Sequence, residues 1–434
     1  MVKTLKKLNL FCDIKFVNRI KNPFVIASFF CVILIYLKIL PIKQKNPYKS
    51  SFEIQKVSFL EGEICSNPTI LSSKKYYYCD LKLKSCGIYL NEHFCKSSAS
   101  GIVKLFIPSQ IVEANYPGKL YSISDGTIFF ENNEKISCKV RYSPKISGFY
   151  VEEAKYLGYE QNLLGKIKHF RAISRIIFKR ILFSWGNAGG LILSLLSGSR
   201  EYLENGLDVF FKTAGLSHIL ALSGMHLSFF SGLSGGFVKK LFGQRFSLIG
   251  RFLGIIFFVF FAGISPSLFR ALLCSFLMLF ASMVFCENVD FFIILCISFL
   301  IHCVSFPSHI FSTAFILSYA ALGGILIFSD LIRYLFKNFV PPKINSSLSA
   351  SVGAQISTAG ISIKLFSQLM PIGIISTVVI SPLISNFLTL SLIGIILSLI
   401  FPVFSKFFGI ILNLLYKCII VLVKIFALVP PIDF

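Results

Sequence analysis

Charged side chains are scarce in this sequence. Asp, Glu, Lys and Arg together make up 15% of its 434 residues, whereas soluble globular domains carry about 25%. Apolar residues reach 55%, and the mean hydropathy is +0.75. A soluble fold of this composition has too few polar side chains to cover its surface, and a disordered chain requires low hydrophobicity. The composition therefore excludes both classes and predicts an integral membrane protein.

Acidic residues are scarcer still. The chain has 20 Asp and Glu against 43 Lys and Arg, which gives a formal net charge of +23 at pH 7. Such an excess arises from basic cytoplasmic loops, from contact with anionic lipid or from binding of nucleic acid. Charge alone leaves these three explanations open.

Several signatures of catalysis are missing as well. The sequence has no C-x-x-C pair, no H-E-x-x-H helix and no Walker phosphate loop, so we predict no metal, no cofactor and no direct use of ATP. One short match remains. Gly232–Gly236 fits the G-x-S-x-G pattern, with Ser234 as nucleophile and His302 as its base. The strand–turn–helix context of a nucleophile elbow is absent, so an intramembrane serine protease stands as the enzymatic alternative.

Residues 1–42 predict a basic cytoplasmic segment followed by one membrane helix. Basic residues dominate the stretch before Pro23, and Asp13 is its only acid. Lys38 is the only charged residue of the apolar segment Pro23–Leu40, which has about the length that spans the hydrocarbon core. The positive-inside rule places the basic flank in the cytoplasm. No A-x-A-like cleavage pattern follows, which predicts an anchor and not a removed signal peptide.

Residues 43–155 then lie outside the cytoplasm and predict a small all-β domain. Five segments alternate between apolar and polar residues and are separated by turn signals: Phe52–Phe59, Tyr76–Leu83, Gly101–Ile107, Lys119–Ile123 and Ile136–Tyr142. Strands at this spacing fit an OB-like barrel, although the pattern fits a sandwich too.

Five of the twelve cysteines fall in this domain, namely Cys65, Cys79, Cys86, Cys95 and Cys138. In an oxidising compartment they are candidates for disulfides. An odd number leaves at least one thiol over, and the pairing cannot be deduced from the sequence. Zinc is the competing explanation, but Cys79 and Cys86 are seven residues apart and lack the usual ligand spacing.

Residues 156–200 contain a basic amphipathic segment. Apolar residues recur at steps of three and four, the period of a helix, and six basic residues interleave with them: Lys166, Lys168, Arg171, Arg175, Lys179 and Arg180. Such a helix lies in the membrane interface as a lipid-facing anchor. The alternative is a funnel whose basic residues contact DNA or another polyanion.

Residues 201–430 predict a bundle of membrane helices. Two of the uncharged runs, 291–329 and 365–405, are each long enough to cross the membrane twice, with breaks at prolines. A last apolar run, Phe404–Leu428, carries three lysines, Lys406, Lys417 and Lys424. We expect roughly eight to ten spans in the whole chain.

The most unusual part of this bundle is Gly215–Gly236, where two histidines and many Ser and Gly residues interrupt a membrane-length run. Polar side chains in a bilayer usually face a bundle interior or a wet cavity. On a straight helix His218 and His226 share a face about 12 Å apart, which is too far to hold one metal ion. Gly224 can break the helix so that backbone groups face a cavity. Packing of small residues between helices is the alternative.

Two further polar positions interrupt apolar runs. No acid lies between Asp208 and Glu287 to pair with Arg270. An arginine in this setting either snorkels from a helix end or meets an anionic substrate. Gln355 lies in a weakly apolar stretch, which favours an interfacial or re-entrant helix.

Several segments, in order, resemble the ComEC-type competence channels. The run GLSHILALSGMH from Gly215 to His226 is similar to the family signature GLSHLLAISGLH. Three later segments continue the resemblance. Phe261–Ala271 is similar to the family's AGaSPSvlRA segment, Phe315–Tyr319 to its FQLSF segment and Ser351–Thr358 to its Ala-Gln-containing segment. The resemblance covers about residues 185–400 together with the external domain, which is OB-like in the family.

The resemblance implies a channel that passes single-stranded DNA through the bacterial inner membrane during DNA uptake. The predicted pathway residues are Gly215, Ser217, His218, Ser223, Gly224, His226, Ser265, Pro266, Arg270 and Gln355. The implied partners are single-stranded DNA, the lipid bilayer, an external DNA receptor and a cytoplasmic translocation motor, and a homo-oligomer is compatible with them.

The chain departs from the family pattern at some positions. Ile316 stands where the family commonly has Gln, and Ser199 where its Gly-Asp-Arg loop has Asp. No H-x-H-x-D-H run of the family's metallo-β-lactamase-like domain occurs, so we predict no enzymatic step in this chain and a nuclease supplied in trans. A reduced transporter or scaffold that does not handle DNA is the second alternative. The expected fold is a polytopic α-helical membrane protein with a small extracytoplasmic all-β, OB-like N-terminal domain.

Overall fold

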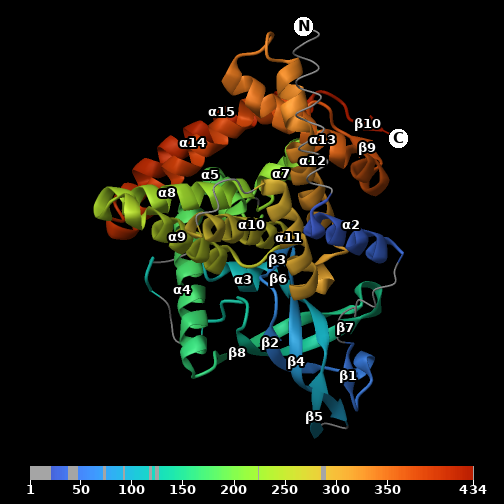
Figure 1. The fold of residues 1–434 in the computed structure, drawn as a ribbon. Coiled ribbons are helices and arrows are strands. Elements are labelled where there is room, and N and C mark those ends of the chain that lie inside the picture. The colour runs from blue at the N-terminus through green and yellow to red at the C-terminus, as the bar shows by residue number, and fades with distance from the viewer. Residues whose placement is uncertain are drawn as a thin grey trace. The chain divides into compact units, whose positions relative to one another are not determined.

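The computed structural model describes residues 21–37, 47–71, 75–90, 93–116, 120–122, 127–222, 224–284 and 290–433. The chain divides into two compact units. The barrel unit holds Gln44–Asp208 and Leu383–Leu422, and the helical unit holds Val209–Pro382 with the two ends of the chain. Figure 1 labels the helices and strands of both units.

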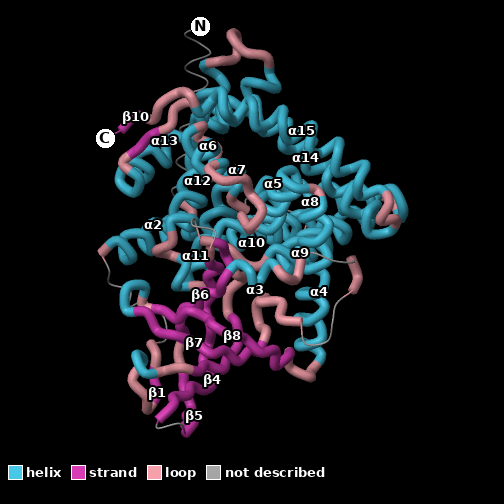
Figure 2. Tube along the Cα trace, turned by 180° about the vertical axis from the view of Figure 1, so that it is seen from behind, coloured by secondary structure: helices cyan, strands magenta, loops and turns pink. Residues whose placement is uncertain are grey.

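Five strands close a β-barrel in the barrel unit: β2 (Phe59–Ile64), β4 (Tyr76–Leu90), β6 (Ile102–Pro108), β7 (Lys135–Ser143) and β8 (Gly148–Gly158). β2 pairs antiparallel with β4 and β7, β4 pairs with β6, and β7 pairs with β8. Parallel pairing of β6 with β8 completes the ring. β5 (His93–Ser100) extends β4 as a hairpin, and the two-residue strands β1 (Lys49–Ser50) and β3 (Thr69–Ile70) pair with β5 and β4 respectively. Figure 2 shows the strands of this unit in magenta.

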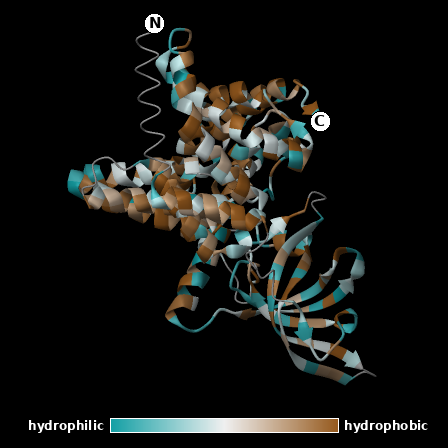
Figure 3. Cartoon of the chain, turned by 45° about the vertical axis from the view of Figure 1, so that its right-hand side comes forward, coloured by the Kyte–Doolittle hydropathy of each residue, from teal (hydrophilic) through white to brown (hydrophobic). Residues whose placement is uncertain are grey.

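Alternation of side chains along the strands fills this barrel, because successive strand residues point to opposite faces. Leu60 and Ile64 of β2, Leu81 of β4, Leu105 of β6 and Phe149 of β8 are fully buried. Figure 3 shows hydrophilic and hydrophobic residues mixed along the strands. The predicted N-terminal β domain is therefore confirmed.

The predicted strands differ from the observed strands in extent. Gly101–Ile107 and Ile136–Tyr142 match β6 and β7, and Tyr76–Leu83 is the first half of β4. Phe52–Phe59 is not a strand, because a 3-10 turn occupies its middle and β2 begins only at its last residue. Of the predicted strand Lys119–Ile123, the described residues 120–122 form a turn and no strand, and the two end residues lie outside the described residues. β5 escaped prediction because its sequence, HFCKSSAS, has little apolar alternation.

The cysteines of this domain are free thiols in the structure, which corrects the predicted disulfides Cys65, Cys79, Cys86, Cys95 and Cys138. Three of the five, Cys79, Cys86 and Cys138, belong to the buried core of the barrel. Burial raises the pKa of the Cys138 thiol to about 12, so this side chain stays neutral. These residues act as small apolar side chains that fill the core.

Three helices accompany the barrel: α3 (Ser109–Glu113), α4 (Leu163–Ser184) and α5 (Gly186–Ser197). Asn162 caps α4, since its Oδ1 accepts a hydrogen bond from the backbone N–H of Gly165 at 2.6 Å. Ala172 and Ile176 of α4 are buried in the core of the barrel. α4 therefore buries part of its apolar side in protein and not in lipid.

The later part of α14 (Gly373–Ile400) and most of α15 (Phe404–Ala427) also belong to the barrel unit. The indole N–H of Trp185 donates to the carbonyl of Ser405 at 2.9 Å, and Asn413 Nδ2 donates to the carbonyl of Trp185 at 2.8 Å. Tyr416 donates to Glu204 at 2.7 Å. These bonds hold one side of α15 to the segment that follows α4.

The helical unit contains α2 (Pro23–Tyr36), α7 (Ser217–Leu220), α8 (Gly224–Phe242), α9 (Ser247–Ala262), α10 (Pro266–Met283), α11 (Phe291–Ser305), α12 (Thr313–Leu335) and α13 (Pro342–Phe366). α6 (Leu207–Thr213) leads into them, and the two-residue strands β9 (Gln368–Leu369) and β10 (Ile432–Asp433) pair antiparallel. Within the described ranges, the 3-10 turns are Ile54–Lys56, Pro144–Ile146, Gln244–Phe246 and Pro307–His309.

Five helices of the described chain are long and apolar enough to cross a membrane, and three shorter apolar helices accompany them. The chain is therefore a polytopic helical membrane protein with an N-terminal β domain. The predicted break of 291–329 is confirmed, because α11 and α12 are separated at Pro307. Of the breaks expected in 365–405, those near Pro371 and Pro402 fall at the two ends of α14. The break near Pro382 is wrong, because α14 continues through Pro382 as one helix of 28 residues, so the run does not form two spans.

Candidate functional site

The polar segment Gly215–Gly236 is broken into two helices. α7 ends at Leu220 and α8 begins at Gly224, where the sequence predicted a break. As a result His218 and His226 do not share one helical face, and that prediction is wrong. His218 is exposed, as is its neighbour Ser217, whereas His226 is fully buried. Ser223 lies outside the described residues.

Gly215 brings the chain close to the start of α14. Its φ is +73°, a left-handed conformation that favours glycine. A Cβ at this position would lie 2.4 Å from the Cα of Gly373. Ser376 Oγ strengthens the same contact by donating to the carbonyl of Ala214 at 2.6 Å. Two backbone segments distant in sequence therefore meet at Gly215 without room for a side chain.

Gln355 reaches the same place from α13. Its Nε2 donates to the carbonyl of Met370 at 3.2 Å, and a Cβ on Gly215 would lie 3.4 Å from that carbonyl oxygen. The structure thus brings together Gly215 and Gln355, two predicted pathway residues. Gln355 lies in α13, a helix of 25 residues, and the interfacial or re-entrant placement of this helix stays a prediction.

Arg270 is fixed in the second turn of α10. Ser265 Oγ caps the helix by accepting from the backbone N–H of Leu268 at 3.3 Å, and Pro266 occupies its first position. Arg270 Nη1 then donates to the carbonyl of Ser318 on α12 at 2.6 Å. Ser265, Pro266 and Arg270 were all predicted as pathway residues, and the structure shows that Ser265 caps α10 and that Pro266 begins it.

The guanidinium of Arg270 also faces the beginning of α8. A Cβ on Gly224, the first residue of α8, would lie 3.4 Å from Arg270 Nη2. The N-terminal end of a helix carries a partial positive charge, so two positive groups approach each other here. Across the described ranges no carboxylate forms an ion pair with Arg270, and Cys274, Tyr319 and His302 are among the polar groups near it. An anion would satisfy both positive groups.

The two residues of the protease alternative have other partners. Ser234 Oγ donates to the carbonyl of Phe230 at 2.8 Å, and it packs so closely on α9 that a Cβ on Gly254 would lie 2.0 Å away. His302 is fully buried and hydrogen-bonds Tyr319 and His309 at 3.3 and 3.1 Å. The structure gives a Ser234–His302 dyad no support.

The basic face of α4 is partly buried. Arg175 Nε lies 2.8 Å from Glu131 Oε2, and Lys179 Nζ lies 3.4 Å from Glu131 Oε1 and 3.1 Å from Glu201 Oε1. These four side chains are at most 4% exposed, and Arg171 is buried beside them. The prediction that Arg171, Arg175 and Lys179 contact DNA or lipid is therefore corrected, because all three are buried in the barrel unit, where Arg175 and Lys179 pair with carboxylates.

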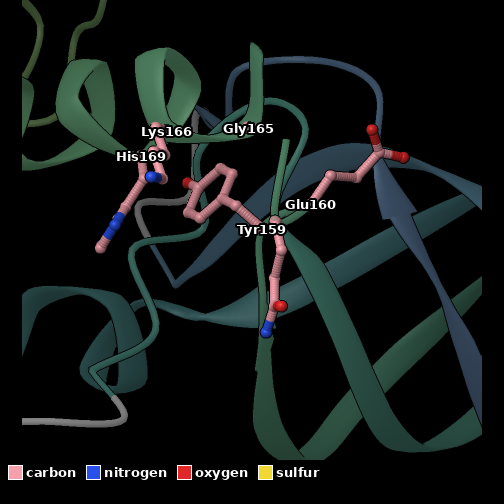
Figure 4. A pocket seen from close by; sticks show the side chains of 6 residues that line it. Tyr159, Glu160, Gly165, Lys166 and His169 are labelled. Carbon is pink, nitrogen blue, oxygen red and sulfur yellow. The ribbon is translucent and has the colours of Figure 1, made fainter. Parts of the chain in front are cut away.

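The other basic residues of α4 lie nearer the surface. Arg180 donates to the carbonyls of Asn115 and Ser122, both at 2.9 Å, and Lys168 Nζ is 3.8 Å from Glu63. Lys166 is exposed and borders an open hollow of about 380 Å³, lined also by Tyr159, Glu160, Gln161, Gly165 and His169 (Figure 4). Of the six predicted basic residues, Lys166 is the most available to a partner.

Sequence reasoning missed an aromatic surface on the outside of the barrel. Tyr89 and Phe94 face each other across β4 and β5, with ring centroids 5.4 Å apart, and the ring of Phe94 lies 5.3 Å from that of Phe59 on β2. Tyr89 is 58% and Phe94 is 44% exposed. Gly87 makes room for them, since a Cβ there would lie 2.5 Å from the Phe94 ring.

Lysines flank these rings in one cross-strand row. Lys139 on β7 is the register partner of Phe59, and Phe59 is the partner of Gly87, which pairs in turn with Lys96. Lys96 Nζ lies 6.0 Å from the centre of the Phe59 ring and also contacts Glu61. We refer to Phe59, Tyr89, Phe94, Lys96 and Lys139 as the aromatic–lysine face. The register of β4 and β5 creates it, and the sequence does not reveal that register.

Comparison with known proteins identifies the family. The sequence profile of the Competence family, described as "Competence protein", matches residues 195–433. The chain is 27% identical over 145 residues to "ComE operon protein 3" of Bacillus subtilis (strain 168). This alignment covers 33% of the present chain and 19% of that protein. The chain is also 26% identical over 212 residues to an "Uncharacterized protein" of Aquifex aeolicus (strain VF5), and this alignment covers 48% of each chain.

These alignments span about a fifth and about half of the two relatives. No solved structure matches the chain. The family profile, however, extends over more than half of the sequence, and it includes the break at Gly224, the capped start of α10 and the contact between Gly215 and Gly373. The chain therefore belongs to the Competence protein family.

Proposed function

We propose that this chain lines a path for single-stranded DNA through the bacterial inner membrane during competence. Membership of the Competence protein family supports a role in DNA uptake. The observation that carries the finer proposal is the arrangement of Arg270 at the beginning of α8. Within the apolar helices, this arrangement presents a positive side chain and a positive helix end to the same point, with no carboxylate of the described chain paired to the guanidinium.

A phosphodiester group suits this point. A cation without a carboxylate partner is costly inside a membrane protein, and such residues usually mark the path of a charged substrate. Arg270 is half-buried among the helices. Arg270 has one hydrogen bond to the carbonyl of Ser318, which fixes its direction without neutralising its charge. The phosphate of a passing strand accepts charge-assisted hydrogen bonds from a guanidinium and from helix N-terminal amides.

The barrel supports the other half of the proposal. Five-stranded barrels of the OB type bind oligonucleotides, and we assign this OB-like role to the barrel of the chain. Its aromatic–lysine face combines exposed rings with lysines, the two features by which proteins hold single strands without sequence preference. The barrel then receives the strand outside the cytoplasm, with the N-terminus inside.

Other partners complete the proposal. An external receptor delivers the DNA, and a cytoplasmic motor pulls the strand, because the sequence has no Walker phosphate loop of its own. A nuclease acting in trans removes the second strand, and the chain itself performs no chemical step. A homo-oligomer fits the same arrangement.

Complementation tests this function. In a naturally competent bacterium whose own channel gene is deleted, expression of the full chain is expected to restore entry of labelled DNA into a nuclease-protected cytoplasmic pool. Surface binding of DNA should be the same with and without the chain, because a receptor performs that step. Surface binding without any protected DNA, at normal membrane levels of the chain, would contradict the proposal.

The aromatic–lysine face gives a second prediction. The double variant Tyr89→Ala/Phe94→Ala should weaken binding of a fluorescent oligothymidylate by about tenfold or more, because stacking contributes about 1–3 kcal/mol per base. Fluorescence anisotropy with the purified full chain in nanodiscs measures this affinity. Leu157→Ala is the control, since Leu157 is an exposed apolar residue of β8 outside that face. Equal affinities of the double variant and the wild type would remove the barrel from the proposed path.

A further inference from the structure

Three lysines of α15 lie on one line of the helix. At 3.6 residues per turn, Lys417 is rotated by only about 20° from Lys406, and Lys424 returns to the same direction. All three side chains are exposed. Lys424 additionally stands over the ring of Phe210 at 5.5 Å. We call Lys406, Lys417 and Lys424 the lysine line.

The lysine line separates two different sides of α15. One side is packed in protein and includes Phe408, Leu412, Tyr416, Ile419 and Val423. The other side is apolar and exposed, with Ile410 at 73% and Leu414 at 67% exposure, followed by Val421 and Ile425. A helix with an exposed apolar side bordered by lysines is typical of helices that lie in a membrane interface.

A hollow of about 560 Å³ opens beside the lysine line within the barrel unit. Its lining consists of Ser184, Lys406, Gly409, Ile410, Asn413, Leu414 and Lys417, so no acidic residue contributes to it. Among the residues with described structure, neither Lys406 nor Lys417 forms an ion pair. The hollow therefore offers two positive charges, two polar side chains and an apolar wall.

The depth of Lys417 distinguishes two orientations of α15. The helix has 24 residues and is about 36 Å long, against a hydrocarbon core of about 30 Å. In a spanning orientation Lys417 would lie near the middle of the bilayer on an exposed side, where a charge is costly. In an in-plane orientation all three lysines stand at one depth, level with lipid phosphates, and the apolar side faces the acyl chains.

We propose that α15 lies in the plane of the membrane surface and that its lysine line binds anionic phospholipid, with one headgroup phosphate held in the hollow at Lys406 and Lys417. The exposed apolar side selects lipid over DNA as the occupant, because a nucleic-acid backbone offers nothing to cover Ile410 and Leu414. Basic pockets beside membrane helices bind anionic headgroups in the same way. The proposal does not depend on DNA transport.

Cysteine labelling tests the orientation. Lys406→Cys, Lys417→Cys and Lys424→Cys are introduced singly into the full chain, and right-side-out and inverted membrane vesicles are treated with a membrane-impermeant maleimide. Peptide mass spectrometry assigns the label to each cysteine. We expect all three positions to react from the same side at similar rates. Protection of Lys417→Cys, with the other two reacting from opposite sides, would establish a spanning helix and overturn the proposal.

Native Cys418 serves as an internal control in the same vesicles. Its direction on the helix, about 100° from that of Lys417, places it on the exposed apolar side, so we expect it to be protected by lipid. Labelling of Cys418 as fast as Lys417→Cys would mean that this side faces water and would overturn the proposal. Protection of Lys417→Cys by an added oligodeoxynucleotide would also overturn it, in favour of DNA contact.

Lipid composition tests the binding of phosphate headgroups. A ligand that binds the folded state raises the apparent melting temperature. The wild type should therefore melt at a higher temperature in nanodiscs that contain phosphatidylglycerol than in nanodiscs of phosphatidylcholine. The variant Lys406→Gln/Lys417→Gln should lose this increase, and Lys145→Gln, at an exposed lysine elsewhere in the barrel unit, should keep it. An increase retained by the double variant, or one reproduced by inorganic phosphate in phosphatidylcholine discs, would overturn the lipid assignment.

Discussion

Replacing Glu131 with glutamine is expected to lower the free energy of unfolding of the barrel unit by about 3–5 kcal/mol, the usual cost of removing one partner from a buried ion pair. Glu131 is 1% exposed and contacts both Arg175 and Lys179. A neutral amide leaves these two cations with one remaining carboxylate, that of Glu201, which reaches only Lys179. Arg175 is then buried without its ion-pair partner.

Acid should remove the same contribution from the wild type. Burial alone would raise the pKa of the Glu131 carboxyl, but Arg175 and Lys179 outweigh burial, and the pKa is lowered. A carboxyl whose pKa is lower in the folded state stabilises the fold above the ordinary carboxyl pKa, and this stabilisation is lost as the pH falls through the lowered value. The Glu131→Gln variant should lack that part of the acid dependence.

Trp185 provides the measurement. It is the only tryptophan of the chain, it is buried, and it belongs to the barrel unit, so its fluorescence reports the unfolding of that unit in the full protein. Glu153→Gln is the matched control, because the Lys139–Glu153 pair at 2.7 Å is exposed and such pairs contribute about 0–1 kcal/mol. Similar losses from Glu131→Gln and Glu153→Gln would show that the buried network does not stabilise the barrel.

The same network explains why α4 was misread from the sequence. Its basic and apolar residues recur at helical spacing, so the helix and its amphipathic character could be predicted. The partners of its basic residues could not be predicted. Glu131 precedes α4 in the sequence, Glu201 follows it, and the two come together only when the barrel closes. In a chain with few acids, a basic helix therefore shows no partner in the sequence, although two buried carboxylates are enough to pair with two of its cations, Arg175 and Lys179.

The membrane part shows a similar division between local and non-local information. Uncharged runs predicted α11 and α12, and Gly224 predicted the start of α8, because length, hydropathy and helix breaking are local properties. Pro382 misled the prediction, since a proline in a membrane helix is tolerated when neighbouring groups satisfy the backbone. The contact of Gly215 with Gly373 joins residues far apart in sequence, and no local pattern announces it.

Replacing Arg270 with glutamine is expected to reduce entry of single-stranded DNA by about 10- to 100-fold. Glutamine removes the positive charge together with the bond from Nη1 to the carbonyl of Ser318, because its side chain ends about where Nε of the arginine lies. Hydrogen bonds to charged groups contribute about 1.5–3 kcal/mol. DNA entry with Arg270→Lys should lie between that of the wild type and that of Arg270→Gln, because lysine keeps the charge and loses the planar, bidentate geometry.

The order of these variants separates an electrostatic role from a structural one. Entry of labelled DNA is measured in the complemented deletion strain, with membrane levels of each variant matched. Ser267→Ala is the control on the same helix, since its hydroxyl donates to the carbonyl of Ala314 at 3.3 Å and thus also joins α10 to α12. If Arg270 only held helices together, Ser267→Ala and Arg270→Gln would be alike and Arg270→Lys would give no rescue. Partial DNA entry with Arg270→Lys and normal entry with Ser267→Ala would show that the positive charge beside Gly224 assists passage of the DNA backbone. Wild-type entry with Arg270→Gln would exclude that role.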